Sequence, residues 1–419
     1  MKKISLLFVC LAALLSNGTA CVAEPAVKTG IEVLRDRGFE GLQGRRVGLV
    51  TNPSGVDRHL NSTIDILFNA PGVELVALYG PEHGVRGDVY AGGKVSDTID
   101  SATGLPVYSL YGSTRKPAPE MLEGIDVMVY DIQDVGARSY TFISTLGLVM
   151  EACADKGIEV MVLDRPNPLG GKKIEGCYVE RPFNSFVSQY RIPYIYGLTV
   201  GELAMLINEE GLNRGQLGDQ APSKCRLTVV PMEGWTRDML YEDTGLPWVL
   251  PSPNIPFKDS PLYYVSSGIC GELYGFLNIG VGYTLPFQIF GAPWIDPVAL
   301  KEKLDSYRLP GISFRTIYYT PIAGSLKGQL TAGVQFFFTD YEKARLTELQ
   351  FYVMQALAEL YPDKKAFEVA NGVGLFDKVC GTDYVREVFS KGYNFADIKE
   401  YWRKDEKSFR ALSQKYHLY

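Results

Sequence analysis

Apolar and polar positions in the first half of the chain follow two periods in alternation. Four short runs that are apolar throughout are predicted to be buried strands, at residues 46–51, 74–79, 126–130 and 159–163. Three segments with helical periodicity occur at residues 62–69, 144–156 and 199–209. Thr199 and Glu202, at the start of the last helix, have the spacing of a capping box. Apolar strands separated by helices are typical of a parallel sheet covered on both faces, which predicts a Rossmann-like α/β domain.

The pattern changes after residue 233 and again near residue 297. Residues 234–296 are dense in Pro, Gly, Trp and Tyr, which predicts a loop-rich connecting segment over the cleft of the first domain. Beyond it, helical patterns occupy 298–307, 347–360 and 395–416, and strand patterns occupy 313–319 and 333–339. We therefore expect an N-terminal leader (1–23), the Rossmann-like domain (24–233), the connecting segment (234–296) and a smaller α+β domain (297–419).

The N-terminus has the form of a secretory signal. Lys2 and Lys3 precede an apolar run at 4–15 that is too short to span a bilayer, and small residues follow it. We expect this signal peptide to be removed on export and the mature protein to be periplasmic. Lipid attachment at Cys21 is the alternative, although Gly18 stands where such signals usually have leucine. No later run is long and apolar enough for a transmembrane helix, so we expect no integral membrane contact.

Composition and charge argue against several classes of function. The chain has 42 Lys and Arg and 48 Asp and Glu, and a net charge of −6 argues against nucleic acid as a partner. Three histidines and the lack of a GxGxxG motif argue against a multi-histidine zinc site and a dinucleotide, so we expect no metal or cofactor. Aromatic residues form 12% of the chain, which suits a sugar ligand. Five cysteines beyond the leader, without CxxC spacing, are interpreted as buried apolar side chains.

Polar side chains follow each of the four predicted strands. The carboxyl ends of parallel strands share one edge of the sheet, where open α/β folds bind their ligands. We therefore expect these polar side chains to converge on one site, although they are far apart in the sequence. They are Asn52, Glu82, His83, Asp131, Gln133, Arg138, Tyr140, Asp164, Arg165 and Asn167.

Glu82 is the leading candidate for acid–base chemistry. It lies on a loop that Pro81 stiffens, beside His83 and close to Arg86. A carboxylate in that setting is suited to act as a general acid or base, and an ion pair with Arg86 alone is the structural alternative. His83 either transfers a proton or orients a neighbouring group, and the sequence favours neither role.

Asp131, Arg138 and Tyr140 follow the third predicted strand. Asp131 directly ends the strand, and we expect it to be a catalytic or ligand-binding carboxylate; the alternative is that it caps the amides that follow. Arg138 and Tyr140 offer a guanidinium and a hydroxyl. These donors would either hold a substrate carboxylate or fix the position of Asp131.

The fourth predicted strand ends in Asp164, Arg165 and Asn167. Asp164 and Arg165 are adjacent, which allows a local ion pair as well as a role in the site. Asn167 lies between two prolines, and so does Asn254 further along the chain in Pro-Asn-Ile-Pro. Each asparagine is therefore rigidly placed, either to contact a ligand or to brace a turn.

Five motifs in a fixed order resemble a known family. They are GPEHGVRG, DIQDVGARSYTF, LDRPNPLGG, GLTVGELA and PSPNIP, and the resemblance extends over residues 30–419. The sequence is similar to the exo-acting β-N-acetylmuramidases of the NamZ type. The resemblance implies a glycoside hydrolase that removes non-reducing-terminal N-acetylmuramic acid from peptidoglycan-derived muramyl saccharides. It also implies a Rossmann-like domain, a smaller C-terminal domain and a cleft between them, with Glu82 at the position of the family's proposed catalytic acid.

One stretch departs from the family pattern. Many members read Phe-Glu-Gly-Thr-Asn and then Gly-Arg-Gly, whereas this chain reads Gly271-Glu272-Leu273 and then Gly280-Val281-Gly282. Glu272 matches the family glutamate only if the alignment is shifted, and Val281 replaces the arginine. We expect Glu272 to contribute to substrate binding, and we expect the departure to affect how the sugar is held.

Glycoside cleavage requires a proton donor at the leaving oxygen and a second group opposite it. We expect Glu82 to be the donor, with its pKa raised by burial, and Asp131 to be its partner. Arg138 or Arg165 would bind the lactyl carboxylate that distinguishes muramic acid from glucosamine. The acetamido group of the substrate is an alternative nucleophile.

Two rival functions follow from the same residues. The first is a non-catalytic periplasmic protein that binds cell-wall sugars, which the Val281 departure keeps open. The second is a metal-dependent hydrolase that uses Asp131, Asp134 and Asp164 as hard oxygen ligands.

Overall fold

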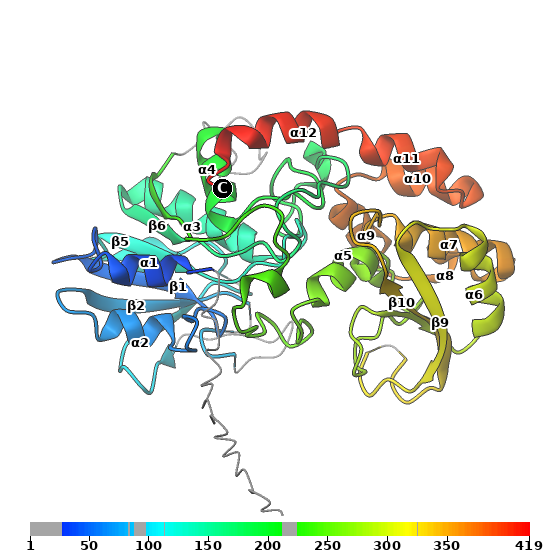
Figure 1. Ribbon diagram of the computed structural model, residues 1–419, viewed down its shortest axis with the longest axis horizontal. Coiled ribbons are helices and arrows are strands. Elements are labelled where there is room, and N and C mark those ends of the chain that lie inside the picture. Colours follow the sequence, from blue (N-terminus) through cyan, green and yellow to red (C-terminus); the bar gives the residue numbers. More distant parts are fainter. Residues whose placement is uncertain (1–26, 83, 88–97, 113, 212–223, 325) are drawn as a thin grey trace, which may run out of the picture.

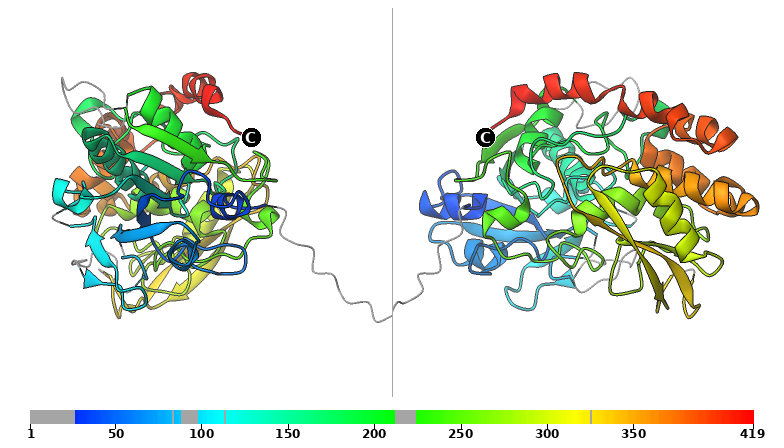
Figure 2. Two further views of the ribbon diagram at one scale, coloured as in Figure 1. Left: turned by 90° about the vertical axis from the view of Figure 1, so that its left-hand side faces the viewer. Right: turned by 45° about the vertical axis from the view of Figure 1, so that its right-hand side comes forward.

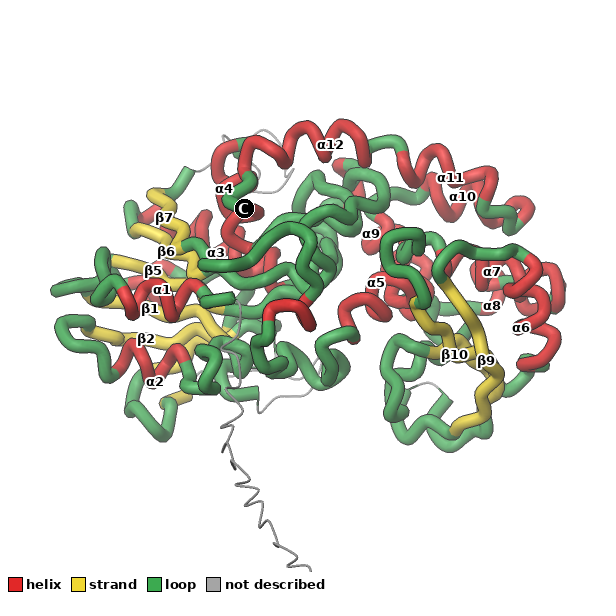
Figure 3. Tube along the Cα trace, viewed as in Figure 1, coloured by secondary structure: helices red, strands yellow, loops and turns green. Residues whose placement is uncertain are grey.

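The protein has two lobes, which lie side by side in Figure 1. The computed structural model describes residues 27–82, 84–87, 98–112, 114–211, 224–324 and 326–419. The first lobe contains a seven-stranded sheet, and the second contains a separate three-stranded sheet. Figure 3 shows long loops between the large sheet and the second lobe, and these loops carry many of the polar residues that follow the strands.

The large sheet has the order β3-β4-β2-β1-β5-β6-β7 and is parallel except where β3 pairs with β4. Its central strand β1 pairs in parallel with β2 and β5, as expected for apolar strands with both faces covered. The strands are β1 Arg46–Thr51, β2 Glu74–Gly80, β3 Thr98–Ile99, β4 Pro106–Ser109, β5 Val127–Asp131, β6 Glu159–Leu163 and β7 Arg226–Val230.

Helices cover both faces of this sheet and bury a core on each side. On one face, α3 (Phe142–Lys156) and α4 (Val200–Glu209) pack side chains such as Leu146 and Leu203 onto the strands. On the other face, α1 (Gly30–Asp36) and α2 (Thr63–Phe68) do the same. The capping box at Thr199 and Glu202 is confirmed. The Thr199 amide donates to the Glu202 carboxylate, and the Glu202 amide donates to the Thr199 hydroxyl. The Rossmann-like prediction is therefore confirmed.

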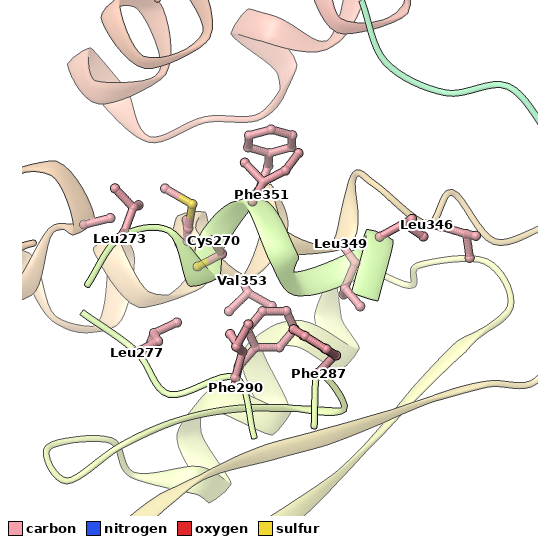
Figure 4. Packing of buried hydrophobic residues seen from close by; sticks show 14 of the residues in the cluster. Cys270, Leu273, Leu277, Phe287, Phe290, Leu346, Leu349, Phe351 and Val353 are labelled. Atoms are coloured by element: carbon pink, nitrogen blue, oxygen red, sulfur yellow. The ribbon is translucent and has the colours of Figure 1, made fainter. Parts of the chain in front are cut away.

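The second lobe is built around an antiparallel sheet with the order β8-β10-β9. Its strands are β8 Ile289–Ala292, β9 Ile312–Tyr319 and β10 Thr331–Phe338. Figure 4 shows the packing of α5 residues such as Cys270 against Phe351 and Val353 of α7. The helices of this part are α5 Ser260–Gly271, α6 Pro297–Ser306, α7 Leu349–Leu360, α8 Ala366–Val369, α9 Val373–Cys380, α10 Tyr384–Gly392 and α11 Ala396–Arg403.

The final helix, α12 (Glu406–Ser413), returns the chain to the first lobe, as both views in Figure 2 and the red ribbon in Figure 1 show. Phe409 and Tyr416 join the core formed by α3 and α4. The Tyr419 hydroxyl donates to Asp164 at 2.7 Å, and the backbone amide of Leu418 donates to Glu202 at 2.8 Å. The last part of the chain thus packs against the domain that the sequence places first.

Two local predictions differ from the structure. Residues 234–296 were expected to be rich in loops, and no regular element was predicted there. They include α5 and β8, because the Gly, Ser and Pro residues of α5 obscure its apolar face in the sequence. Pro261 lies in the first turn of α5, where proline is well tolerated. The single helix expected at 395–416 is interrupted after Arg403, and α12 starts at Glu406.

The guanidinium of Arg138 joins the two lobes. It is fully buried and donates to the carbonyls of Cys177 and Ile192 in the first lobe, each at 2.7 Å. It also donates to the carbonyls of Val379 and Cys380, at 3.0 and 2.7 Å, at the end of α9. No acidic side chain of the described residues forms an ion pair with it, so four carbonyl oxygens and the Ser188 hydroxyl compensate the buried charge. Burial lowers the pKa of Arg138.

Replacement of Arg138 by methionine is expected to lower the free energy of unfolding by about 3 kcal/mol, because four buried carbonyls lose a charged donor. Urea unfolding followed by tryptophan fluorescence measures this loss. Arg37→Met removes an exposed arginine and serves as the matched control. Equal unfolding midpoints for the two variants would contradict a joining role for Arg138.

Candidate active site

A cavity of about 480 Å³ lies where the loops of the large sheet meet α5. Its volume falls within the range of about 300–1,000 Å³ that is typical of small-molecule sites. The first lobe contributes Glu82, which follows β2, and Tyr140, which precedes α3. Asn254 and Glu272 come from the segment expected to form a connecting loop. Four of the predicted site residues are therefore brought together, although their roles stay predictions.

Glu82 lies at the cavity wall because β2 ends at Gly80 and Pro81 starts the loop that follows. The Thr141 hydroxyl donates to its Oε2 at 3.1 Å. Tyr111 also lines the cavity beside Glu82. Burial, followed by the charge of Glu82 and a hydrogen bond to it, raises the pKa of Tyr111 to about 12. Two hydroxyl-bearing side chains therefore fix the orientation of the Glu82 carboxylate.

Glu272 directly follows the last residue of α5 and lies on the cavity wall. Burial raises the pKa of Glu272 to about 7, and a hydrogen bond from the Tyr274 hydroxyl, 3.3 Å from Oε2, opposes the shift. A negative charge is also disfavoured at the C-terminal end of a helix, where the backbone carbonyls point. Near neutral pH, Glu272 therefore exists in both the protonated and the ionised form, which is the state that a general acid needs.

Aromatic rings and hydroxyl groups form much of the remaining wall. The rings of Tyr140 and Tyr264 meet edge to face at 5.4 Å, and Tyr264 meets Phe287 in the same way at 5.0 Å. The Tyr140 hydroxyl donates to Ser252 Oγ at 2.5 Å, and Ser139 Oγ lies 2.9 Å from the Tyr264 hydroxyl. Such a wall combines flat apolar faces with polar edges, as a sugar ring does.

Asp131 does not face this cavity, contrary to our expectation. It is fully buried, and Arg165 donates to both of its carboxylate oxygens, at 2.5 and 2.9 Å. Thr63 donates a further bond at 2.5 Å. Neither Asp131 nor Arg165 lines the cavity that holds Glu82, so the predicted pairing of Glu82 with Asp131 is wrong. The ion pair instead joins the carboxyl ends of β5 and β6.

Arg138 was expected near a substrate carboxylate, but its donors are bonded to backbone carbonyls and it lies outside the cavity wall. Asp164 was expected to bind substrate, with a local ion pair to Arg165 as the alternative. It does not line the cavity, and its carboxylate accepts from the Thr199 hydroxyl at 2.7 Å and the Gly201 amide at 2.8 Å. It thereby caps the start of α4. Both side chains have structural roles that satisfy buried backbone groups.

The amide side chains of Asn52, Gln133 and Asn167 brace loops rather than line the cavity. Asn52 donates to the Pro251 carbonyl at 3.1 Å, and Asn167 donates to the Leu198 carbonyl at 2.8 Å. Gln133 donates to the carbonyls of Asp134 and Pro166. For Asn167 the turn-bracing alternative is therefore the one that the structure shows, and the prediction that Asn52 and Gln133 line the site is wrong.

His83 lies outside the described residues. The three aspartates considered as metal ligands do not gather, because each has its own partners: Arg165 for Asp131, Tyr196 for Asp134 and Thr199 for Asp164. Within the described ranges there is no group of three or more His, Cys, Asp or Glu side chains that could hold a metal ion. The donor set for the metal-dependent alternative is therefore not assembled there.

Several cavity residues were missed from the sequence. Tyr111 follows β4, a strand of four residues that was not predicted, and Tyr264 lies on α5, which was expected to be loop. Thr141 directly follows Tyr140, and Ser252 lies two residues before Asn254, so their positions next to predicted site residues were a usable signal. The five cysteines beyond the leader are all free and buried, which confirms their interpretation as apolar side chains.

Models of two adjoining protein domains match almost the whole of the described chain. The model for the N-terminal part of exo-β-N-acetylmuramidase NamZ matches residues 47–259, and that for its C-terminal part matches residues 262–419. The chain belongs to the NamZ family. The boundary between the two NamZ models falls at the start of α5, so Glu82 and Glu272 come from different domains.

Individual relatives of the NamZ family agree with this result. The chain is 43% identical over 396 residues to the peptidoglycan β-N-acetylmuramidase NamZ of Bacillus subtilis, which covers 94% of this chain and 92% of that protein. Two crystal structures of DUF1343 family proteins from Bacteroides fragilis are similar. One is 53% identical with a TM-score of 0.90 over 95% of this chain and all of that one. The other is 28% identical with a TM-score of 0.73 over 94% and 99%.

The departure from the family pattern falls inside the cavity. Val281, where the resemblance led us to expect an arginine, lines the same wall as Glu272. In addition, no helix among the described residues has the length and apolar character needed to cross a membrane.

The Glu272 carboxyl is expected to ionise with a midpoint near pH 7. Because burial disfavours the charged form, the protonated carboxyl persists below that pH and is lost as the pH rises through it. Infrared difference spectra between about pH 6 and pH 8 measure the loss of the protonated carboxyl band. The band should be absent in Glu272→Gln and retained in Glu40→Gln, an exposed control. An identical band in both variants would assign the titration to another group.

Proposed function

We propose that this protein is an exo-acting glycosidase that releases N-acetylmuramic acid from the non-reducing ends of peptidoglycan fragments. The observation that carries this proposal is the shared cavity of Glu82 and Glu272, one from each domain of a NamZ family chain. Glycosidases generally use two carboxylic groups beside the scissile bond. The identity of the sugar is inferred from the family and from the Bacillus subtilis relative, and the exo mode of action is inferred from the family.

The two carboxyl groups take different roles in this proposal. Glu272 keeps a proton near neutral pH, so it donates that proton to the leaving oxygen. Glu82, oriented by Thr141 and Tyr111, acts on the other reacting group: it stabilises positive charge at the anomeric carbon or orients the attacking nucleophile. This assignment moves the role of acid from Glu82, where the sequence placed it, to Glu272.

The remaining wall supports substrate positioning. Tyr140, Tyr264 and Phe287 present ring faces and edges on which a pyranose packs, and Asn254 offers an amide for its hydroxyl groups. A sugar that fills the cavity excludes water from both carboxyl groups and so strengthens their effect on the developing charge.

Export to the periplasm forms part of the same proposal. The leader at residues 1–23 has the form of a secretory signal, and peptidoglycan fragments are an extracytoplasmic substrate. The sugar-binding alternative without catalysis has no support from any relative found, and the experiment below distinguishes it, because a receptor releases no sugar.

The roles of the two carboxyl groups are separated by changing the leaving group. A 4-nitrophenyl muramide needs little protonation when its bond breaks, whereas a muramyl-glucosamine disaccharide needs a proton donor. Glu272→Gln is expected to lower kcat/KM on the disaccharide by about 10²-fold or more but to affect the nitrophenyl substrate much less. Glu82→Gln should lower both by about 10²-fold or more. Released sugar and nitrophenol are the measured products.

The opposite pattern, with Glu82→Gln active on the nitrophenyl substrate alone, would return the role of acid to Glu82. Near-wild-type turnover of both substrates by both variants would remove the two residues from the mechanism. Asn69→Ala, an exposed change at the end of α2, is the control for preparation and folding.

A further inference from the structure

The described wall of the cavity contains two carboxylic side chains and no lysine, arginine or histidine. The proposed substrate carries a carboxylate on its lactyl group, so the charge of Glu82 would face a group of the same sign. A carboxylate transferred from water to such a surface is unfavourable unless a cation compensates it. A cation is therefore needed within reach of the bound sugar.

The two arginines that the sequence suggested for this purpose are unavailable. Arg138 makes five hydrogen bonds to backbone carbonyls and to Ser188 in the interior. Arg165 is bonded to Asp131 and to the carbonyl of Val56. Releasing either guanidinium would leave buried acceptors without partners, which is costly.

Arg115 is linked to the same cavity through the ring of Phe186, which contacts the cavity residue Tyr111. It is exposed, and its guanidinium stacks over the ring of Phe186 at 4.3 Å. The Phe186 ring lies 6.5 Å from the ring of Tyr111, and both Tyr111 and Val187, the neighbour of Phe186, line the cavity. The charge of Arg115 also acts on the Tyr111 hydroxyl, where it opposes the effect of Glu82. Arg115 is thus held within electrostatic reach of Tyr111, the side chain that contacts Glu82.

The neighbouring cation has a different environment. Lys116 is neutralised by Glu151 and Asp155, at 2.6 and 2.8 Å. No acidic side chain in the described part of the chain forms an ion pair with Arg115. Stacking on Phe186 restricts the position of the guanidinium, but its N–H donors have no carboxylate partner. A guanidinium held in this way is suited to bind a carboxylate.

We propose that Arg115 is a specificity-determining residue that binds the carboxylate of the terminal muramyl residue at the mouth of the cavity. This inference rests on the proposed function, because it assigns the contact that separates a muramyl from a glucosaminyl substrate. The carboxylate belongs either to a free lactyl group or to a peptide attached to it, and both present the same chemistry to a guanidinium.

The test compares ligands that differ only in charge. Binding of N-acetylmuramic acid, its lactyl carboxamide and its lactyl-L-alanine derivative is measured by calorimetry, and turnover of the matching nitrophenyl glycosides is measured alongside. Arg115→Gln is expected to weaken binding of the free acid by about threefold to tenfold and to leave the carboxamide within about twofold. The alanine derivative shows whether Arg115 also binds a carboxylate that lies one residue further from the sugar. Raising the salt concentration should reduce the wild-type preference for the acid.

Lys116→Gln is the matched control, because it removes the same charge one residue away. Equal losses for the acid and the carboxamide in Arg115→Gln would show that Arg115 only supports Phe186 and Tyr111. No loss for either ligand, or an equal loss in Lys116→Gln, would also overturn the proposal, as would failure of the wild-type protein to bind the free acid. Binding with the expected preference but without sugar release would instead contradict the proposed function and leave the role of Arg115 standing.

Discussion

The fixed relation between the two lobes depends on one buried cation. The guanidinium of Arg138 has carbonyl partners on both sides of the junction and no carboxylate, so its charge is compensated only while the lobes stay together. Apolar side chains from both lobes, such as Ala137 and Phe351, form one continuous core around it. The cavity exists at this junction, and its two acidic groups come from different domains. The geometry of the site is therefore a consequence of the packing between lobes.

The four central strands β2, β1, β5 and β6 and the helices α2, α3 and α4 could be predicted from the sequence because the signal is local. Fully apolar runs such as 46–51 and the capping box at Thr199 have meaning within a few residues. The second lobe was harder to predict, because α5 contains Gly, Ser and Pro and its identity as a helix depends on packing against α7. Glu272 was predicted only from its likeness to a family motif, since nothing in the neighbouring sequence shows that it follows a buried helix.

The polar residues at the sheet edge illustrate the limit of topological reasoning. Topology places Glu82, Asp131 and Asp164 at the same edge, and that placement is correct. It does not say which of them are needed by the protein itself, because exposed strand ends and helix starts require partners of their own. Asp131 meets Arg165, and Asp164 caps α4, so both are used in the fold. Glu82 contacts hydroxyl groups and remains on the cavity wall.

The buried position of Glu272 at the C-terminal end of α5 has a consequence for calorimetry. Ligand that fills the cavity removes further water from this carboxyl, which increases its affinity for a proton. Near pH 7, where part of the population is ionised, sugar binding is then coupled to proton uptake from the buffer. The apparent enthalpy of binding would vary with the ionisation enthalpy of the buffer, and this coupling would disappear when glutamine replaces Glu272.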